Sequence, residues 1–250
     1  MNIFGKAIII LAAAATVISC KKDEILMQNN LTMGNVVDGT FVSDQGNIFN
    51  IVERNTIKNI EGMSRALTIC DILKKVEGTQ NVYDVRLNAV TEVFTKKPIL
   101  LEYADASKDE SVNDPVHIQE LWISGGYINM YIMLEMKYNS DQKHLINLVY
   151  DENGSADGKY VFQLRHNSYG ESLIYEATNI GYGGTYVSFP ISDIIKDNNA
   201  ELTISSRWYQ TDGYGWSSEV VDYSYDRTYT KGGFEHAPTS VQEKTTTKVN

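Results

Sequence analysis

The sequence is poor in cysteine, proline and basic side chains. Among 250 residues there are two cysteines and four prolines, and 22 Lys and Arg stand against 32 Asp and Glu, a net charge of -10. Cys20 lies in the N-terminal segment, which leaves Cys70 alone and excludes an internal disulfide or a cysteine-rich metal site. The acidic balance argues against nucleic acid as a partner, because phosphate backbones repel an acidic surface. With 42% apolar and 22% charged residues, the composition is still that of a folded globular protein.

The sequence also lacks an apolar run long enough to span a bilayer. Residues 7–18 are almost wholly apolar, but this run has about 12 residues where a transmembrane helix needs roughly 20. It has the length of a signal-peptide core and ends in VISC (residues 17–20), which resembles a bacterial lipobox. We therefore expect residues 1–19 to be removed as a lipoprotein signal peptide. Acylated Cys20 would then anchor the chain in a lipid bilayer, because several acyl chains hold durably where one does not. The alternatives are an ordinary secretory signal with a chance cysteine, or a buried core helix.

The residues that follow Cys20 indicate where the anchored protein faces. KKDE (residues 21–24) resembles the surface-export signal of Bacteroidota lipoproteins. Residues 20–35 as a whole are expected to form a lipidated, polar tether, because such residues have little to pack against a core. The sequence thus predicts a lipid-anchored outer-membrane protein exposed at the cell surface, with a periplasm-facing lipoprotein as the alternative.

Residues 36–105 show short strand patterns separated by turn residues. In residues 82–95 apolar and polar side chains alternate, so that Tyr83, Val85 and Leu87 are expected to point inward. About five short strands without a strong helix favour a small barrel such as an OB fold. Residues 106–114 are polar and charged, which indicates a linker between two domains.

Residues 115–230 favour a second domain with longer strands, roughly eight in all, as in a β-sandwich. A hairpin is predicted for residues 116–123 and 127–136 around a Gly-Gly turn, and a second for residues 145–150 and 160–166. Residues 231–250 have no apolar period and are expected to be disordered. The predicted fold class is therefore all-β, a small OB-like barrel followed by an antiparallel β-sandwich.

The connection within the second hairpin, residues 151–158, has oxygen-bearing side chains at alternate positions. That spacing is similar to a calcium-binding loop, but the glycine and the final glutamate of such a loop are missing from their places. A hairpin turn at Asn153-Gly154 explains the stretch without an ion.

Several stretches resemble the NigD-like lipoproteins of Bacteroidota. The most specific is DPVHIQELWISGGYINMY, residues 114–131. The others are DGTFVSDQGNIFNIVE (38–53), RALTICDIL (65–73), YDVRL (83–87), HLINLVYD (144–151) and LRHN (164–167). The resemblance implies an OB-like domain followed by a β-sandwich, in agreement with the strand pattern. It also implies a role, because the family takes its name from a bacteriocin gene cluster in which such a protein is a proposed immunity factor. It implies no catalytic residues.

The residues themselves contain no recognisable catalytic motif. The chain lacks G-x-S-x-G and the phosphate-binding G-x-x-x-x-G-K-[ST]. Cys70 lies in an apolar strand, where a thiol acts as a small hydrophobic side chain and not as an exposed thiolate. His144 and His166 start and end strands that are predicted to pair, so they can meet and, with an acid, hold Zn²⁺; the alternative is that each ring packs and makes one hydrogen bond. We expect neither an enzyme nor a cofactor or metal site.

Aromatic residues concentrate in the second domain. Tyr214 and Trp216 lie in a glycine-rich hairpin tip and Tyr182 lies in a second glycine-rich loop. These three are the candidate partner-binding residues, because exposed aromatic side chains on rigid loops gain contact area at little entropic cost. The same rings can stack on sugars, or serve only as strand residues with high β propensity.

The charge of the second domain bears on the partner. Residues 113–230 carry 16 acidic and 7 basic side chains, which suits a basic partner, although solubility explains the charge equally well. We therefore predict a non-enzymatic surface lipoprotein that binds a secreted peptide or protein, in a bacteriocin-immunity role by resemblance. The alternative is a glycan-binding accessory lipoprotein.

Overall fold

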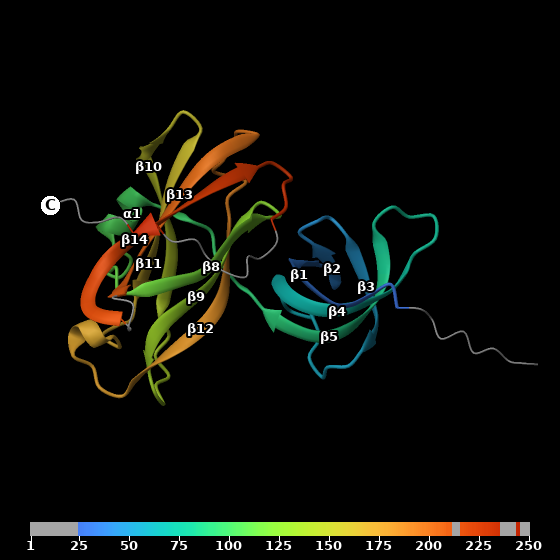
Figure 1. Ribbon diagram of the computed structural model, residues 1–250, viewed down its shortest axis with the longest axis horizontal. Coiled ribbons are helices and arrows are strands. Elements are labelled where there is room, and N and C mark those ends of the chain that lie inside the picture. Colours follow the sequence, from blue (N-terminus) through green and yellow to red (C-terminus); the bar gives the residue numbers. More distant parts are fainter. Residues whose placement is uncertain (1–24, 212–215, 236–243, 246–250) are drawn as a thin grey trace, which may run out of the picture.

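Five strands close into a barrel that forms the first domain (Figure 1). The structure is a computed structural model that describes residues 25–211, 216–235 and 244–245. The barrel strands are β1 (Met27–Val37), β2 (Thr40–Ser43), β3 (Ile48–Arg54), β4 (Arg65–Lys75) and β5 (Val82–Glu92). They follow the order β1-β2-β3-β5-β4, in which β3 and β5 run parallel and the other pairs antiparallel. This five-stranded arrangement is that of an OB fold, so the predicted barrel is confirmed.

The barrel core follows the alternation seen in the sequence. Val85 and Leu87 of β5 are fully buried, as predicted, whereas Tyr83 is only partly buried and packs at the edge of the core. Cys70 is 1% exposed within this core, which confirms the interpretation of its thiol as a small hydrophobic group. Barrel closure depends on Gly34 of β1, because a Cβ there would come within 2.7 Å of Ser43 Cα in β2.

The second domain is a β-sandwich of two mixed sheets. The larger sheet has the order β15-β14-β13-β11-β10-β7 and the smaller has the order β6-β12-β9-β8. The strands are β6 (Phe94–Thr95), β7 (Ile99–Leu100), β8 (Val116–Ser124), β9 (Tyr127–Lys137), β10 (Leu145–Ala156), β11 (Lys159–Asn167), β12 (Ile180–Pro190), β13 (Asn199–Thr211), β14 (Trp216–Thr230) and β15 (Lys244–Thr245). One short helix, α1 (Leu101–Ala106), and one 3₁₀ turn, η1 (Leu173–Tyr175), complete the elements of the described residues. The all-β class is confirmed.

The sequence predicts an antiparallel sandwich, but three of its strand pairs are parallel. The pairs β7–β10, β6–β12 and β11–β13 are parallel. For β11 and β13 the reason lies in the connection, because the chain crosses to β12 in the opposite sheet before it returns beside β11. A strand that returns after one excursion to the other sheet runs in its original direction.

Both predicted hairpins are present, but one turn is displaced. β8 and β9 are joined by Gly125 and Gly126, which have φ values of 60° and 81°. In the β10–β11 hairpin the turn lies at Asp157-Gly158, with φ values of 53° and 79°, and not at Asn153-Gly154. Two successive left-handed residues match the twist of a two-residue hairpin, which explains why Asp-Gly forms the turn. Gly154 lies within β10, where its N–H donates to the Asp151 carboxylate, so no calcium loop is formed.

Two expected boundaries differ in the structure. The polar tether of residues 20–35 ends earlier, since β1 begins at Met27 and fills the place between β2 and β4 that closes the barrel. The polar segment 106–114 is part of the sandwich and not a linker between domains, because β6 and β7 already pair with sandwich strands and Asp114 is buried. The chain passes from barrel to sandwich between β5 and β6, near Val93.

The C-terminal residues also differ from the expected disordered tail at two places. Phe234 forms a β-bridge with Ser124, and β15 pairs with Tyr223 and Ser224 of β14. The other residues beyond 235 lie outside the described residues. So do Cys20 and the expected signal peptide. No helix in the described part of the chain has the length and apolarity needed to cross a membrane.

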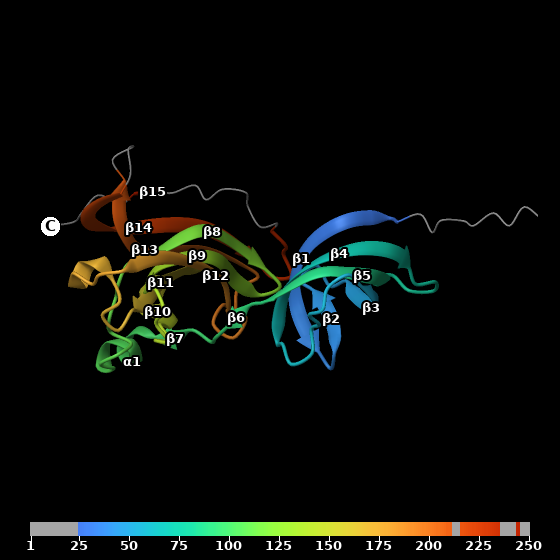
Figure 2. The same ribbon diagram turned by 90° about the horizontal axis from the view of Figure 1, so that it is seen from below.

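The two domains meet end to end, as Figure 2 shows, and a buried ion pair lies at their junction. Arg65 of β4 contacts Asp44 at 2.6 Å, and both side chains are 1% exposed. From the sandwich, Asn129 Oδ1 accepts from Arg65 Nη2 at 2.9 Å and Ser188 Oγ accepts from Nε at 3.0 Å. The Tyr127 ring stacks on the guanidinium at 3.9 Å. One barrel arginine thus holds three side chains of the sandwich.

An apolar contact surrounds this interdomain ion pair. Met33 and Val93 pack against Trp122 of the sandwich, and all three are at most 5% exposed. Together the ion pair and this cluster fix the barrel against the end of β8 and β9.

Candidate partner-binding surface

The structure describes only one of the three predicted partner-binding side chains. Tyr182 is 48% exposed and lies in strand β12, not in a loop. Tyr214 lies outside the described residues. Trp216 is the first residue of β14, but its side chain is not among those described.

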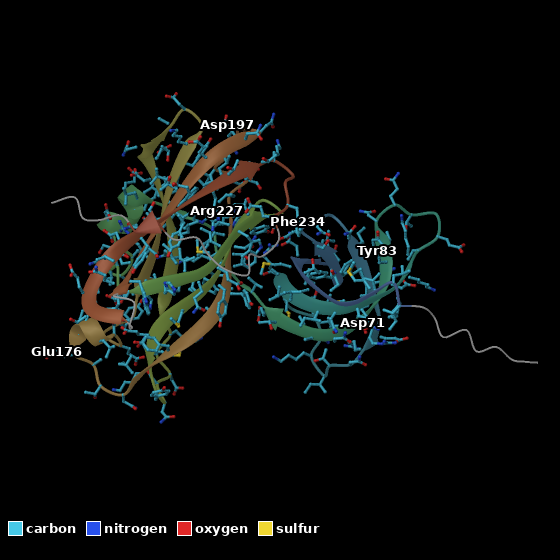
Figure 3. All side chains as sticks on the ribbon, viewed as in Figure 1. Asp71, Tyr83, Glu176, Asp197, Arg227 and Phe234 are labelled. Carbon is cyan, nitrogen blue, oxygen red and sulfur yellow. The ribbon has the colours of Figure 1, made fainter. Side chains whose placement is uncertain are left out.

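Tyr182 belongs to a group of exposed apolar side chains at one end of the sandwich, which we call the distal patch. Its seven members are between 42% and 59% exposed: Met136, Tyr138, Tyr169, Leu173, Ile174, Tyr175 and Tyr182. They come from the end of β9, the segment after β11, the 3₁₀ turn η1 and the start of β12. The label of Glu176, next to η1, lies in Figure 3 at the end of the molecule opposite to the barrel residues Asp71 and Tyr83.

Two glycines of β12 leave room for two side chains of the distal patch to pack against the strand. A Cβ at Gly181 would lie 2.9 Å from Cε1 of Tyr138, and one at Gly183 would lie 3.2 Å from Cε of Met136. Contacts this close are rarely tolerated, so both side chains lie flat on strand backbone that carries no side chain of its own. The glycine-rich sequence around Tyr182 therefore marks a surface on which neighbouring side chains are held.

A buried carboxylate fixes η1 beneath the distal patch. Glu135 of β9 is 0% exposed, and its Oε2 accepts from Ser172 Oγ at 2.5 Å, Leu173 N at 2.9 Å and Tyr209 OH at 3.0 Å. Its Oε1 has no hydrogen-bond partner within the described residues. Burial, reinforced by the Glu135 charge, raises the pKa of Tyr209 far above its ordinary value, so the phenol remains a donor.

A second buried carboxylate holds the segment that precedes η1. Asp114 Oδ2 accepts from the N–H and the hydroxyl of Ser168 at 2.8 and 2.6 Å, and Oδ1 accepts from Tyr175 OH at 2.6 Å. Burial and the Asp114 charge raise the pKa of Tyr175 to about 12. Because charge-assisted hydrogen bonds are the strong ones, the backbone under the distal patch is fixed by two carboxylates.

The structure brings His144 and His166 together, as the strand pairing had allowed. His144 Nδ1 lies 2.9 Å from His166 Nε2, and His166 Nδ1 lies 2.9 Å from the carbonyl oxygen of Pro115. Because a carbonyl only accepts, His166 donates from Nδ1 and accepts from His144 at Nε2. Burial lowers the pKa of His166 to about 4, so its ring is neutral.

The remaining nitrogen of His144 faces a carboxylate. Its Nε2 lies 3.3 Å from Glu171 Oε2, while Ser140 Oγ donates to the other oxygen of that carboxylate. The hydrogen bond from Ser140 is the main cause that lowers the pKa of Glu171. No group of three His, Cys, Asp or Glu side chains within the described ranges is placed to hold a metal ion. The arrangement fits the alternative in which each ring packs and hydrogen-bonds.

The exposed side chains at this end of the sandwich are suited to contact with a partner. They include aromatic rings, aliphatic side chains and a thioether, together with the exposed carboxylate of Glu176, whereas the carboxylates of Asp114 and Glu135 are buried. Cys70 lies in the barrel, where burial raises the pKa of its thiol to about 11. A thiol in that environment is not a nucleophile.

Comparison with known proteins agrees with this architecture. Residues 99–221 match the family described as the NigD-like C-terminal beta sandwich domain. This part of the chain is a NigD-like C-terminal beta sandwich domain. The matched range includes all of the distal patch and begins at β7, in agreement with a sandwich that starts before residue 115. None of the curated proteins matches the chain.

Solved structures of Bacteroidales proteins share the fold over both domains. A protein of unknown function from Bacteroides vulgatus is 22% identical, with a TM-score of 0.55 over 84% of this chain and 92% of that chain. A NigD-like immunity protein from Bacteroides caccae is 17% identical, with a TM-score of 0.53 over 79% and 91%. A candidate lipoprotein from Bacteroides fragilis is 14% identical, with a TM-score of 0.56 over 80% and 97%. At these identities the likeness establishes the fold alone.

Proposed function

We propose that this NigD-like protein is a non-enzymatic lipoprotein of the outer-membrane surface that binds a secreted peptide or protein through the distal patch. The observation that carries the proposal is seven large apolar side chains, each 42–59% exposed, at one end of the sandwich. Clustered exposed apolar side chains mark interaction sites in soluble domains. The two buried carboxylates beneath them hold the surface in one conformation, which lowers the entropic cost of binding.

The composition and charge of this region indicate the chemistry of the partner. Four of the seven side chains are tyrosines and one is a methionine, residue types that are enriched at protein interfaces. Residues 113–230 carry 16 acidic against 7 basic side chains, so a basic partner is drawn toward this domain. A small cationic toxin from a competing bacterium has this chemistry, and a NigD-like protein from Bacteroides caccae bears the name of an immunity protein.

Anchoring at Cys20 supports the same role. The VISC sequence of residues 17–20 and the candidate lipoprotein of Bacteroides fragilis both favour a lipid anchor. A protein held at the outer membrane meets a secreted toxin before the toxin reaches the membrane.

A glycan is the alternative partner, because tyrosine rings also stack on sugars. The distal patch, however, includes Met136, Leu173 and Ile174, whose flexible or branched apolar side chains contact protein better than they contact a hydroxyl-rich ring. The observation therefore favours a protein.

The proposal is tested with the mature chain carrying Cys20→Ser, immobilised and exposed to secreted protein fractions of competing bacteria and to a glycan panel. We expect a small basic protein to be retained. Tyr138→Ala combined with Ile174→Ala should abolish retention, because both side chains are exposed and neither anchors the backbone.

Tyr103→Ala is the matched control, since Tyr103 is 62% exposed on α1 and lies outside the distal patch. Retention that survives the double substitution, or that Tyr103→Ala removes equally, would contradict the proposal. A retained glycan would favour the alternative.

A further inference from the structure

The outer strand of the smaller sheet has a second chain segment on its free side. β8 is the last strand in the order β6-β12-β9-β8, so one side of it has no full partner strand. At the end of β8 near the barrel, Phe234 forms a β-bridge with Ser124. Glu235 N donates to Ile123 O at 3.0 Å, and Ile123 N donates to Glu235 Oε2 at 2.9 Å. We call Phe234–Glu235 the C-terminal segment.

The C-terminal segment replaces a strand only in part. Along a regular strand pair, the N–H of Ile123 would donate to a backbone carbonyl, but here it donates to a side-chain carboxylate. Further along the same side, the carbonyl of Leu121 accepts from Nε of Arg227 at 3.2 Å, again a side chain. Native proteins cover exposed strand edges in this way because an open edge pairs with other chains.

A cavity lies beside the C-terminal segment at the junction of the two domains. Its volume is about 210 Å³, and its walls include Leu31, Met33 and Leu67 from the barrel and Trp122 and Phe234 from the sandwich side. Figure 3 shows Phe234 between the two domains. The site thus combines an available strand edge with an apolar pocket for one side chain, which are the two parts of recognition by strand addition.

We propose that the β8 edge and this cavity form an acceptor site for an extended peptide with an aromatic residue followed by an acidic one. The C-terminal segment has that pattern and covers the β8 edge beside the cavity until such a peptide displaces it. Glu235 is joined to Ile123 by one main-chain hydrogen bond and by its carboxylate, and both Phe234 and Glu235 remain partly exposed. The site lies at the end of the sandwich opposite to the distal patch, so it is independent of the function proposed above.

The test uses a fluorescent peptide of the chain's own sequence, TKGGFEHAP (residues 230–238), and the mature chain with Cys20→Ser. Binding is followed by anisotropy. We expect saturable binding to the Phe234→Ala, Glu235→Ala variant that is at least about tenfold tighter than to the unsubstituted chain. When the C-terminal segment covers the site, the apparent affinity for the peptide equals the intrinsic affinity multiplied by the fraction of molecules in which the site is open. A peptide with Ala at the Phe and Glu positions should not bind.

Lys231→Ala is the matched control, because Lys231 is exposed and only its backbone N–H is bonded, to Asn198 O. This variant should bind the peptide as weakly as the unsubstituted chain. Hydrogen exchange gives a second readout, since loss of Glu235 should speed exchange at the Ile123 amide while circular dichroism is unchanged.

Three results would overturn the proposal. The first is no peptide binding by the doubly substituted chain, and the second is equal binding by both chains. The third is self-association of the unsubstituted chain that the peptide competes away, because the occupant would then be a second copy and not a separate peptide.

Discussion

Replacing Arg65 by methionine should strongly destabilise the junction between the domains. The Arg65 and Asp44 side chains are each 1% exposed and lie 2.6 Å apart. Without the guanidinium, the Asp44 carboxylate keeps the hydroxyl of Ser124 as a donor at 2.6 Å but loses its counter-charge. Removing one partner of a buried ion pair costs about 3–5 kcal/mol, because the other charge stays buried and uncompensated. Asn35 and Asn129 lose a donor as well, so we expect a loss within that range.

Urea unfolding measures this loss. Tryptophan fluorescence reports on the junction, because Trp122 packs there against Met33 and Val93. Arg65→Met should lower the free energy of unfolding by about 3–5 kcal/mol. Arg65→Met combined with Asp44→Ala should cost less than the sum of the two single substitutions, because no unpaired charge then remains.

The matched control is an exposed ion pair of the sandwich. Lys159 and Glu201 lie 3.4 Å apart with side chains 68% and 71% exposed. Lys159→Met should therefore change stability by no more than about 1 kcal/mol. If Arg65→Met costs no more than Lys159→Met, the junction is not held by the buried ion pair and the reasoning is refuted.

Three further predictions concern single residues. Burial lowers the pKa of His117 and of His166 from 6.5 to about 4, so only the unfolded chain binds these protons as the pH falls below 6.5. The free energy of unfolding should then fall by about 1.4 kcal/mol for each ring per unit fall in pH. His117→Phe should halve the slope of the free energy of unfolding against pH, measured by urea unfolding between pH 6.5 and 4.5. An unchanged slope would contradict this. Gly34→Ala should cost about 1–3 kcal/mol because its Cβ meets strand backbone, whereas Gly154→Ala meets only the Asp151 side chain and should cost less; equal thermal melting points would be evidence against barrel closure at Gly34. The Cys70 thiol, with a pKa raised to about 11, should not react with a disulfide reagent at pH 8 until the chain is unfolded, and rapid labelling of folded protein would show that it is accessible.

Local features of the fold could be predicted from the sequence, and long-range pairings could not. The β8–β9 hairpin and the buried face of β5 follow from a two-residue period and a Gly-Gly turn, which are properties of adjacent residues. The polar residues of segment 106–114 predict a linker, but the segment is part of the sandwich. Its Asp114 is buried by Ser168 and Tyr175, which lie 54 and 61 positions further along the chain.

In the candidate site, too, the local feature could be predicted from the sequence and the long-range contacts could not. Tyr182 was predicted from aromatic and glycine residues that are neighbours in sequence. Met136 joins it only because β9 pairs with β12, where Gly181 lies opposite Met136. Glu135, between Leu134 and Met136, carries no sequence signal of its burial, because the donors that satisfy it come from η1 and β13.

Photo-crosslinking at the distal patch tests the central claim most directly. A benzophenone amino acid would replace Ile174, which is 42% exposed, or Tyr103 as control, in the full-length lipoprotein displayed on living cells. After exposure to secreted fractions of competing bacteria and irradiation, we expect a covalent adduct with a small basic protein at position 174 and none at position 103. Adducts of equal yield at both positions, or none at position 174 while the protein still retains its partner, would contradict the account.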